Sequence, residues 1–189
     1  MPARISPAQP PFAPAVQETL EKIMPPGVPP LSLFTTMARD ERLFGKFFAA
    51  SLLDRGHLTL RQRELIIDRT TALCRSEYEW GVHMAFFGER AGFSAGQIEA
   101  LVHGTPQDEC WSAEDSAVLQ ICDALHRDCG VDEDAWQALR AHFAEETILE
   151  MLMLAGFYRT VSYLTNALRL PLESYAMRFP LRVATREPQ

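Results

Sequence analysis

The chain has 189 residues, enough to bury one sizeable core, and 47% of them are hydrophobic, as in ordinary globular domains. Its formal net charge of −7 and its scattered basic residues argue against a nucleic-acid-binding surface. No apolar run is long enough to span a bilayer and the proline-broken N-terminus does not resemble a signal peptide, so no membrane partner is expected. Four cysteines without C-x-x-C spacing indicate reduced thiols and a cytoplasmic protein.

The first 30 residues are predicted to form a proline-rich arm with one short helix, over residues 16–24. The prolines between Pro25 and Pro30 must then break that helix. Residues 31–55 have a helical apolar pattern with a possible break near Asp40, and Gly56 is a natural stop.

The middle of the chain carries two helix-start signals. Thr59 with Gln62 forms a capping-box pattern that predicts a helix to about Leu73. Ser76 is predicted to open the next helix, which should run to Gly92.

The second half of the chain repeats the same helical pattern. Ser94 with Gln97 repeats the capping-box pattern, and helices are expected over residues 94–104, 112–130, 132–143 and 147–170. The last of these is apolar nearly all round, which indicates burial in the centre of a bundle or in a subunit interface. No strand pattern is found, so the prediction is an all-α fold.

A candidate site lies where two of these helices meet. Glu79 and His83 are four residues apart, so they share one helix face and can form an acid/base pair. Ser76 is at the start of that face, and Glu64 sits in an otherwise apolar stripe of the preceding helix. Glu64, Ser76, Glu79 and His83 are therefore the predicted catalytic residues.

Simpler interpretations of the same residues stay open. Ser76 and Glu79 match a capping box and could only start a helix. His83 could be a satisfied core histidine, and Glu64 could pair with a neighbouring arginine, Arg61 or Arg63.

The rest of the sequence offers little other chemistry. The remaining histidines have no ligand spacing, so no metal site is predicted, and no nucleotide-binding motif or other cofactor signature is present. Tyr78 and Trp80 are interpreted as core or as the wall of a substrate pocket, with Cys74 beside them.

The run from Arg61-Gln62-Arg63-Glu64-Leu65 through Ser76-Glu77-Tyr78-Glu79-Trp80-Gly81-Val82-His83 to Ala91-Gly92-Phe93-Ser94 resembles the carboxymuconolactone decarboxylase superfamily, which includes AhpD-like alkylhydroperoxidases. Glu150, Tyr158 and Asn166 fit the closing pattern of that superfamily loosely. The resemblance implies an oligomeric AhpD-like helical bundle, from dimer to hexamer. It covers about residues 31–170, between the arm of residues 1–30 and a tail of residues 171–189.

The resemblance transfers some functional residues and not others. In the peroxidase members a C-x-x-C pair precedes a histidine, and an upstream glutamate completes a proton relay. Glu64 and His83 fit the glutamate and histidine positions, whereas Ser76 and Glu79 occupy the two cysteine positions. Cys74 has no resolving thiol three residues on, so the disulfide cycle lacks an obvious route.

Three hypotheses follow. The first is a cofactor-free enzyme that uses Glu79 and His83 to decarboxylate or isomerise a small organic acid or lactone, with Glu64 tuning the pair. The second is an AhpD-like antioxidant thiol peroxidase that uses Cys74. The third is a non-catalytic oligomeric scaffold.

Overall fold

The computed structural model describes residues 2–181, and within that range all regular secondary structure is helical, with no strand. Its elements, in chain order, are α1 (Pro14–Ile23), α2 (Ser32–Met37), α3 (Glu41–Ala49), α4 (Leu60–Leu73), α5 (Glu77–His83), the π-helical turn η1 (Met84–Gly88), α6 (Ala95–His103), α7 (Ala113–Asp128), α8 (Glu133–Arg140) and α9 (Glu145–Leu168). The all-α prediction is confirmed.

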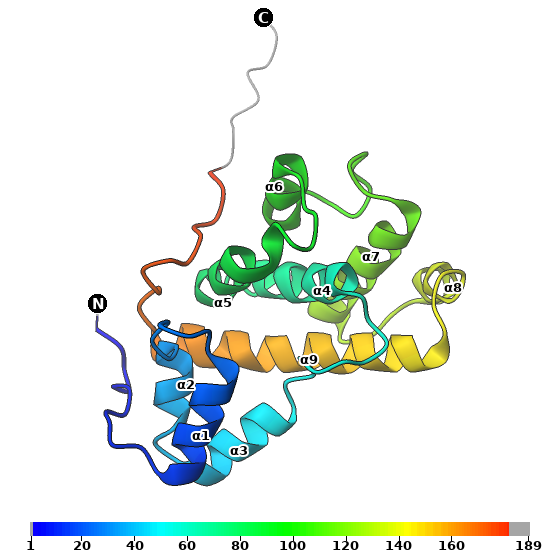
Figure 1. The fold of residues 1–189 in the computed structure, drawn as a ribbon. Helices are drawn as coiled ribbons and strands as arrows, with labels where there is room; N and C mark the ends of the chain where they lie inside the picture. Colours follow the sequence, from blue (N-terminus) through cyan, green and yellow to red (C-terminus); the bar gives the residue numbers. More distant parts are fainter. Residues whose placement is uncertain (1, 182–189) are drawn as a thin grey trace, which may run out of the picture.

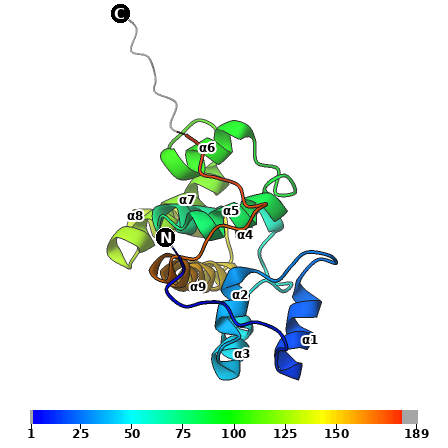
Figure 2. The same cartoon turned by 90° about the vertical axis from the view of Figure 1, so that its left-hand side faces the viewer.

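Helices α4 and α9 organise the bundle. Helix α4 packs against α5, α6, α7 and α9, and its Leu65, Ile66 and Ile67 are fully buried. Figure 1 shows α9 lying across the molecule, with α4 on one side and the group α1–α3 on the other, and Figure 2 shows the same separation after a quarter turn. Two layers therefore meet along α9.

Helix α9, predicted to be buried in the centre of the bundle or in a subunit interface, is buried on one side within the single chain. Its Ile148 and Leu154 are buried, but a row on the opposite side faces solvent, with Leu149 and Met153 each 62% exposed and Tyr163 58%. The helix is therefore amphipathic within one chain, and a subunit interface on this face stays a prediction.

The segment predicted as one helix over residues 31–55 is two shorter helices. Asp40 accepts a hydrogen bond from the Leu43 backbone N–H (2.9 Å) and starts α3, as the possible break anticipated. Helix α3 ends at Ala49 rather than at Gly56. A Cβ at Gly56 would collide with the Glu150 carboxylate, so this glycine permits a close approach instead of ending a helix.

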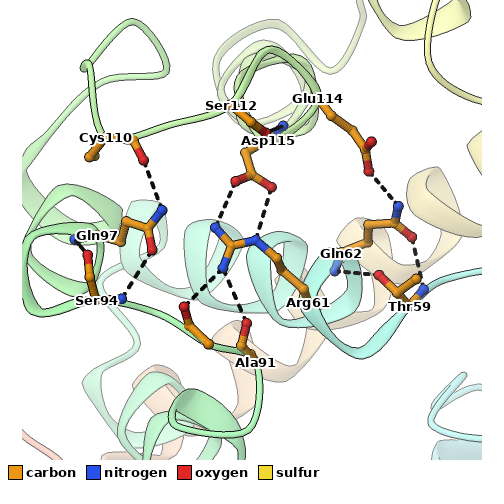
Figure 3. Close-up of polar contacts among 11 residues, drawn as sticks. Thr59, Arg61, Gln62, Ala91, Ser94, Gln97, Cys110, Ser112, Glu114 and Asp115 are labelled. Atoms are coloured by element: carbon orange, nitrogen blue, oxygen red, sulfur yellow. Dashed lines mark hydrogen bonds and ion pairs between the residues drawn. The ribbon is translucent and has the colours of Figure 1, made fainter.

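Capping side chains fix the ends of other helices as predicted. Thr59 with Gln62 and Ser94 with Gln97 both form complete capping boxes. Between them, Arg61 connects three elements, because its guanidinium donates to both carboxylate oxygens of Asp115 on α7 and to the carbonyl of Ala91. Figure 3 shows this fork, which attaches the start of α4 to the loop before α6.

The terminal segments pack on the bundle. In the arm, Val16 and Leu20 form a small separate core with Phe44 of α3. After α9, residues 171–181 run as an extended strap along α5, where the Met177 N–H donates to the Gly81 carbonyl (3.0 Å). The proposed boundaries at residues 30 and 170 stay predictions, and most of the 171–189 tail, residues 182–189, lies outside the described residues.

Candidate active site

The turn between α4 and α5 sets the geometry of the site. Arg75 adopts a left-handed backbone conformation (φ 55°), and the Ser76 N–H donates to the Thr71 carbonyl (2.8 Å), a Schellman-like end to α4. The chain reverses there, so α5 returns along α4. Glu64, near the start of α4, therefore faces His83 at the end of α5.

Glu64 and His83 form a buried ion pair. The Nδ1 of His83 lies 2.7 Å from Oε2 of Glu64, and both side chains are almost fully buried. Glu64 also accepts a bond from Nε of Arg63 through its other oxygen (3.1 Å). Both predicted partners of this acid, the histidine and an adjacent arginine, are therefore present.

The other nitrogen of His83 faces two more polar groups. Nε2 lies 3.0 Å from the hydroxyl of Tyr158 on α9 and 3.5 Å from Oε1 of Glu79. Burial lowers the pKa of His83, but the carboxylates of Glu64 and Glu79 outweigh it and raise that pKa to about 10. The ring is therefore an imidazolium at neutral pH, and both its N–H groups donate.

Glu79 has one oxygen that is not used by the protein. Its Oε2 is buried and has no hydrogen-bond partner among the described residues. A buried acceptor left alone costs free energy, so this oxygen is available to a hydrogen-bond donor from a ligand. Burial also raises the pKa of the Tyr158 hydroxyl well above its usual value, so this residue is a neutral donor.

Asp68 extends the cluster by a fifth titratable group that the sequence did not single out. It lies one turn after Glu64 on α4, is 0% exposed, and has no hydrogen-bond partner among residues 2–181 for either oxygen. Burial and the charge of Glu64 raise its pKa, against the opposing effect of His83. Asp68 therefore keeps its proton to a higher pH than an ordinary aspartate does.

A pocket opens beside this cluster, and we call it the phenylalanine pocket. Its volume is about 280 Å³, and Glu79, His83 and Tyr158 form its polar end. Its walls are largely aromatic and come from α2, α3, η1 and α9: Phe34, Phe47, Phe48, Phe86, Phe87 and Phe157. Residues 23–25 of the N-terminal arm also line it, so the arm is part of the site.

The turn η1 shapes one wall of this pocket. The predicted helix from Ser76 to Gly92 is α-helical only to His83, and the π-helical turn Met84–Gly88 follows. Such turns often occur at functional sites, because they change the direction of neighbouring side chains. Here the consecutive Phe86 and Phe87 both line the pocket.

Ser76 lies away from the phenylalanine pocket. Its hydroxyl is 2.7 Å from that of Thr165 on α9, and it makes no side-chain cap bond to α5. The alternative of a Ser76–Glu79 capping box is wrong, because the Ser76 N–H is already bonded to Thr71 and Glu79 points toward His83.

Three other predicted pocket residues are also elsewhere. Tyr78 and Trp80 contact the C-terminal strap, since the Tyr78 hydroxyl donates to Glu173 (2.5 Å) and the Trp80 ring packs on Phe179. Cys74 ends α4 with its Sγ 3.8 Å from Nδ1 of His126. None of the three lines the pocket.

Within residues 2–181, no group of three or more His, Cys, Asp or Glu side chains is arranged to hold a metal ion. The same range contains no helix that is both long and apolar enough to cross a membrane.

Part of the chain matches a known protein family. The model of the carboxymuconolactone decarboxylase family matches residues 41–123, from α3 into α7, and this range includes Glu64, Glu79 and His83. This match supports, over that range, the resemblance to the carboxymuconolactone decarboxylase and AhpD-like superfamily. No curated protein sequence matches it.

Solved structures confirm the AhpD-like fold. A peroxidase-related protein from Silicibacter sp. TM1040 is similar with a TM-score of 0.79 and 18% identity, over 95% of this chain and 98% of that one. An alkylhydroperoxidase AhpD core protein from Ralstonia eutropha JMP134 has a TM-score of 0.73 and 18% identity, over 90% of this chain and 93% of that one. The debrominase Bmp8 has a TM-score of 0.76 and 14% identity, over 91% of this chain and 93% of that one.

Three features of the site were missed by sequence reasoning. Tyr158 was noticed only as part of a closing pattern, although its bond to His83 places it in the site. Asp68 could have been found, because it follows Glu64 by one helical turn. The aromatic walls come from four separate segments, and no local pattern brings those together.

Proposed function

We propose that the protein is a cofactor-free acid/base enzyme that decarboxylates or isomerises a small organic acid or lactone. The observation that carries the proposal is the free Oε2 of Glu79, which lies beside the His83–Tyr158 pair at the polar end of an apolar pocket. Four free cysteines support a cytoplasmic location as part of the same proposal.

Glu79 exchanges a proton with carbon in this mechanism. In an isomerisation its carboxylate removes the proton next to a carbonyl, and the electron pair of the C–H bond moves toward the carbonyl oxygen. The proton then returns to a different carbon. In a decarboxylation the electron pair of the C–C bond to the substrate carboxylate moves toward the carbonyl oxygen instead, and carbon dioxide leaves. A protonated Glu79 then delivers its proton to carbon.

Tyr158, His83 and Glu64 act on the oxygen side. The imidazolium N–H of His83 donates to the Tyr158 oxygen, so the phenol hydrogen is free to bond the carbonyl oxygen of a substrate. Negative charge that develops on that oxygen is stabilised by a donor fixed in place in an apolar pocket, where such bonds are strongest. Glu64 keeps the imidazole charged.

The names of the similar structures favour a peroxidase as the second candidate, and Cys74 would be its thiol. Its surroundings argue against it. Burial raises the pKa of the Cys74 thiol, and His126 beside it has a lowered pKa, so neither forms a reactive ion pair at neutral pH. Cys74 also lies outside the phenylalanine pocket.

The test is a screen of small lactones and unsaturated carboxylic acids for carbon-bound deuterium exchange and for release of carbon dioxide. We expect activity in the parent protein and a loss of about a hundred- to ten-thousand-fold in Glu79→Gln and in His83→Ala, as is typical for acid/base groups. The parent rate should also fall as the pH rises through about 10, where His83 loses its proton.

The control is Glu99→Gln on α6, the same exchange outside the pocket, which should leave the rate unchanged. A fall of less than about fivefold in a folded His83→Ala protein would reduce this histidine to a structural role. Peroxide consumption with a dithiol reductant that is robust in the parent and absent in Cys74→Ser would replace the proposal by the peroxidase.

A further inference from the structure

We propose that the substrate is a neutral, flat ring compound with an enolisable ring carbonyl, so that the reaction is an isomerisation by proton transfer. This inference rests on the proposed function and narrows it. It is drawn from the size, the walls and the polar atoms of the phenylalanine pocket.

The size of the pocket limits the occupant to a small molecule. An apolar cavity of about 150 Å³ holds benzene, and the phenylalanine pocket, at about 280 Å³, has nearly twice that volume. One substituted ring or two fused rings fit into this space. The arm contributes to its enclosure, because Ile23, Met24 and Pro25 form part of the wall.

The walls favour an aromatic or unsaturated ring. Phe34 and Phe48 pack edge to face with centroids 4.9 Å apart, and Phe47 and Phe157 are 5.2 Å apart, so these rings hold each other in place. Such a wall offers both faces and edges to an occupant, and both are good partners for a flat ring. An open-chain polyacid would find almost no hydrogen-bond partners there.

The polar end distinguishes an enol from an acid. Oε2 of Glu79 can only accept when the group is ionised, whereas the Tyr158 hydroxyl can donate. An enol hydroxyl satisfies both, since it donates to Glu79 and accepts from Tyr158. A carboxylate would face two carboxylates, Glu64 and Glu79, against the single positive charge of His83. The arginine that lines the pocket, Arg90, is exposed and has its guanidinium over the Phe87 ring (5.6 Å).

Glu79 both removes and returns the proton, so the reaction needs no other proton donor or acceptor. Glu79 takes the proton from the ring carbon, the C–H pair forms the C=C bond, and the carbonyl pair moves to oxygen, which is bonded by Tyr158. Return of the Glu79 proton to another ring carbon completes the shift. No oxidant, reductant or second substrate is consumed.

A phenol is a stable analogue of such an enol, so the test is a binding experiment with three ligands of one shape. Titration calorimetry on the full chain would compare 4-ethylphenol, ethylbenzene and 4-ethylbenzoate. We expect 4-ethylphenol to bind about tenfold or more tightly than the other two, from its two hydrogen bonds to buried groups.

Variants of the pocket residues then test where the hydroxyl group of the bound phenol lies. Tyr158→Phe and Glu79→Gln should each lower the affinity for 4-ethylphenol by about tenfold and leave the affinity for ethylbenzene unchanged. Tyr163→Phe is the matched control, because this exposed tyrosine of α9 is outside the pocket. Its affinity for 4-ethylphenol should equal that of the parent protein.

Three results would overturn the inference: no binding of 4-ethylphenol, equal affinity for ethylbenzene, or tighter binding of 4-ethylbenzoate, which would indicate an acid held near Arg90. These failures can be told apart from failure of the proposed function. Phenol binding without any proton exchange would leave the ring class standing and refute the acid/base reaction. Proton exchange on open-chain acids without phenol binding would support the acid/base reaction and refute the ring class.

Discussion

Replacing Asp68 by asparagine tests whether this buried acid carries a proton in the folded protein. The groups that face it are Glu64 on its own helix, Glu79 and His83 from α5, and Tyr158 from α9. Burial and the charge of Glu64 raise its pKa. Asparagine has nearly the same shape as the protonated acid but cannot ionise, so the change isolates the effect of ionisation.

The size of the effect follows from proton linkage. In the unfolded chain Asp68 titrates near its ordinary pKa of about 3.9, while the folded protein keeps the proton to higher pH. Between these two values the folded state binds one more proton than the unfolded state. The free energy of unfolding of the parent therefore falls with rising pH, by at most about 1.4 kcal/mol per pH unit from this group.

Asp68→Asn lacks this loss, so its stability relative to the parent should rise steadily as the pH increases from about 4. The ion pair of His83 adds a slope of the same sign above about pH 6.5, because the folded state keeps its proton up to about pH 10 while the unfolded state loses it near pH 6.5. This slope is present in the parent and in the variant, so it cancels in the difference between them.

Urea denaturation followed by tryptophan fluorescence, at one protein concentration and several pH values between 4 and 8, would measure the difference. A difference in unfolding free energy that stays constant with pH would show that Asp68 ionises normally, and would refute the reasoning. A variant less stable than the parent at every pH would show that the carboxyl group makes a favourable contact.

Three further predictions concern the scaffold. Gly81→Ala should destabilise the protein by about 1–3 kcal/mol in urea denaturation, because its Cβ would collide with the strap, whereas Gly45→Ala on open α3 should have little effect or a slightly stabilising one. Arg61→Lys should lose about 1–3 kcal/mol by the same measurement, since lysine cannot reproduce the fork to Asp115 and the Ala91 carbonyl. We also propose self-association through the exposed side of α9, so Met153→Glu should lower the mass seen by light scattering; a monomeric parent at micromolar concentration would contradict this.

Local signals made most of the fold predictable. The capping boxes at Thr59 and Ser94 are formed by side chains within one turn of the helix start, and they predicted those starts correctly. Helix ends were harder. Gly56 was interpreted as a stop, but α3 ends at Ala49, and Gly56 instead leaves room for the Glu150 carboxylate, far away in sequence, to approach the backbone. A glycine in a sequence does not indicate which of these two reasons applies.

The polar part of the site was also predictable, and the pocket was not. Helical spacing brings Glu79 and His83 to one face, and the turn at Arg75 then brings Glu64 opposite, so short-range geometry was sufficient. Tyr78 and Trp80 are adjacent to that face in sequence but point to the strap. The direction of an aromatic side chain on a short helix depends on which distant segments cover it, and the sequence of the helix does not contain this information.

The same turn explains why Glu79 is free for chemistry. A glutamate at the third position of a helix commonly bonds back to the N–H of the cap residue. Here the N–H of Ser76 is bonded to the Thr71 carbonyl, and its hydroxyl is bonded to Thr165. Both groups that would tie Glu79 to the helix start are occupied, so its carboxyl group turns toward His83 and the pocket. The helix-end hydrogen bond of α4 and the free oxygen of the site are thus consequences of one turn.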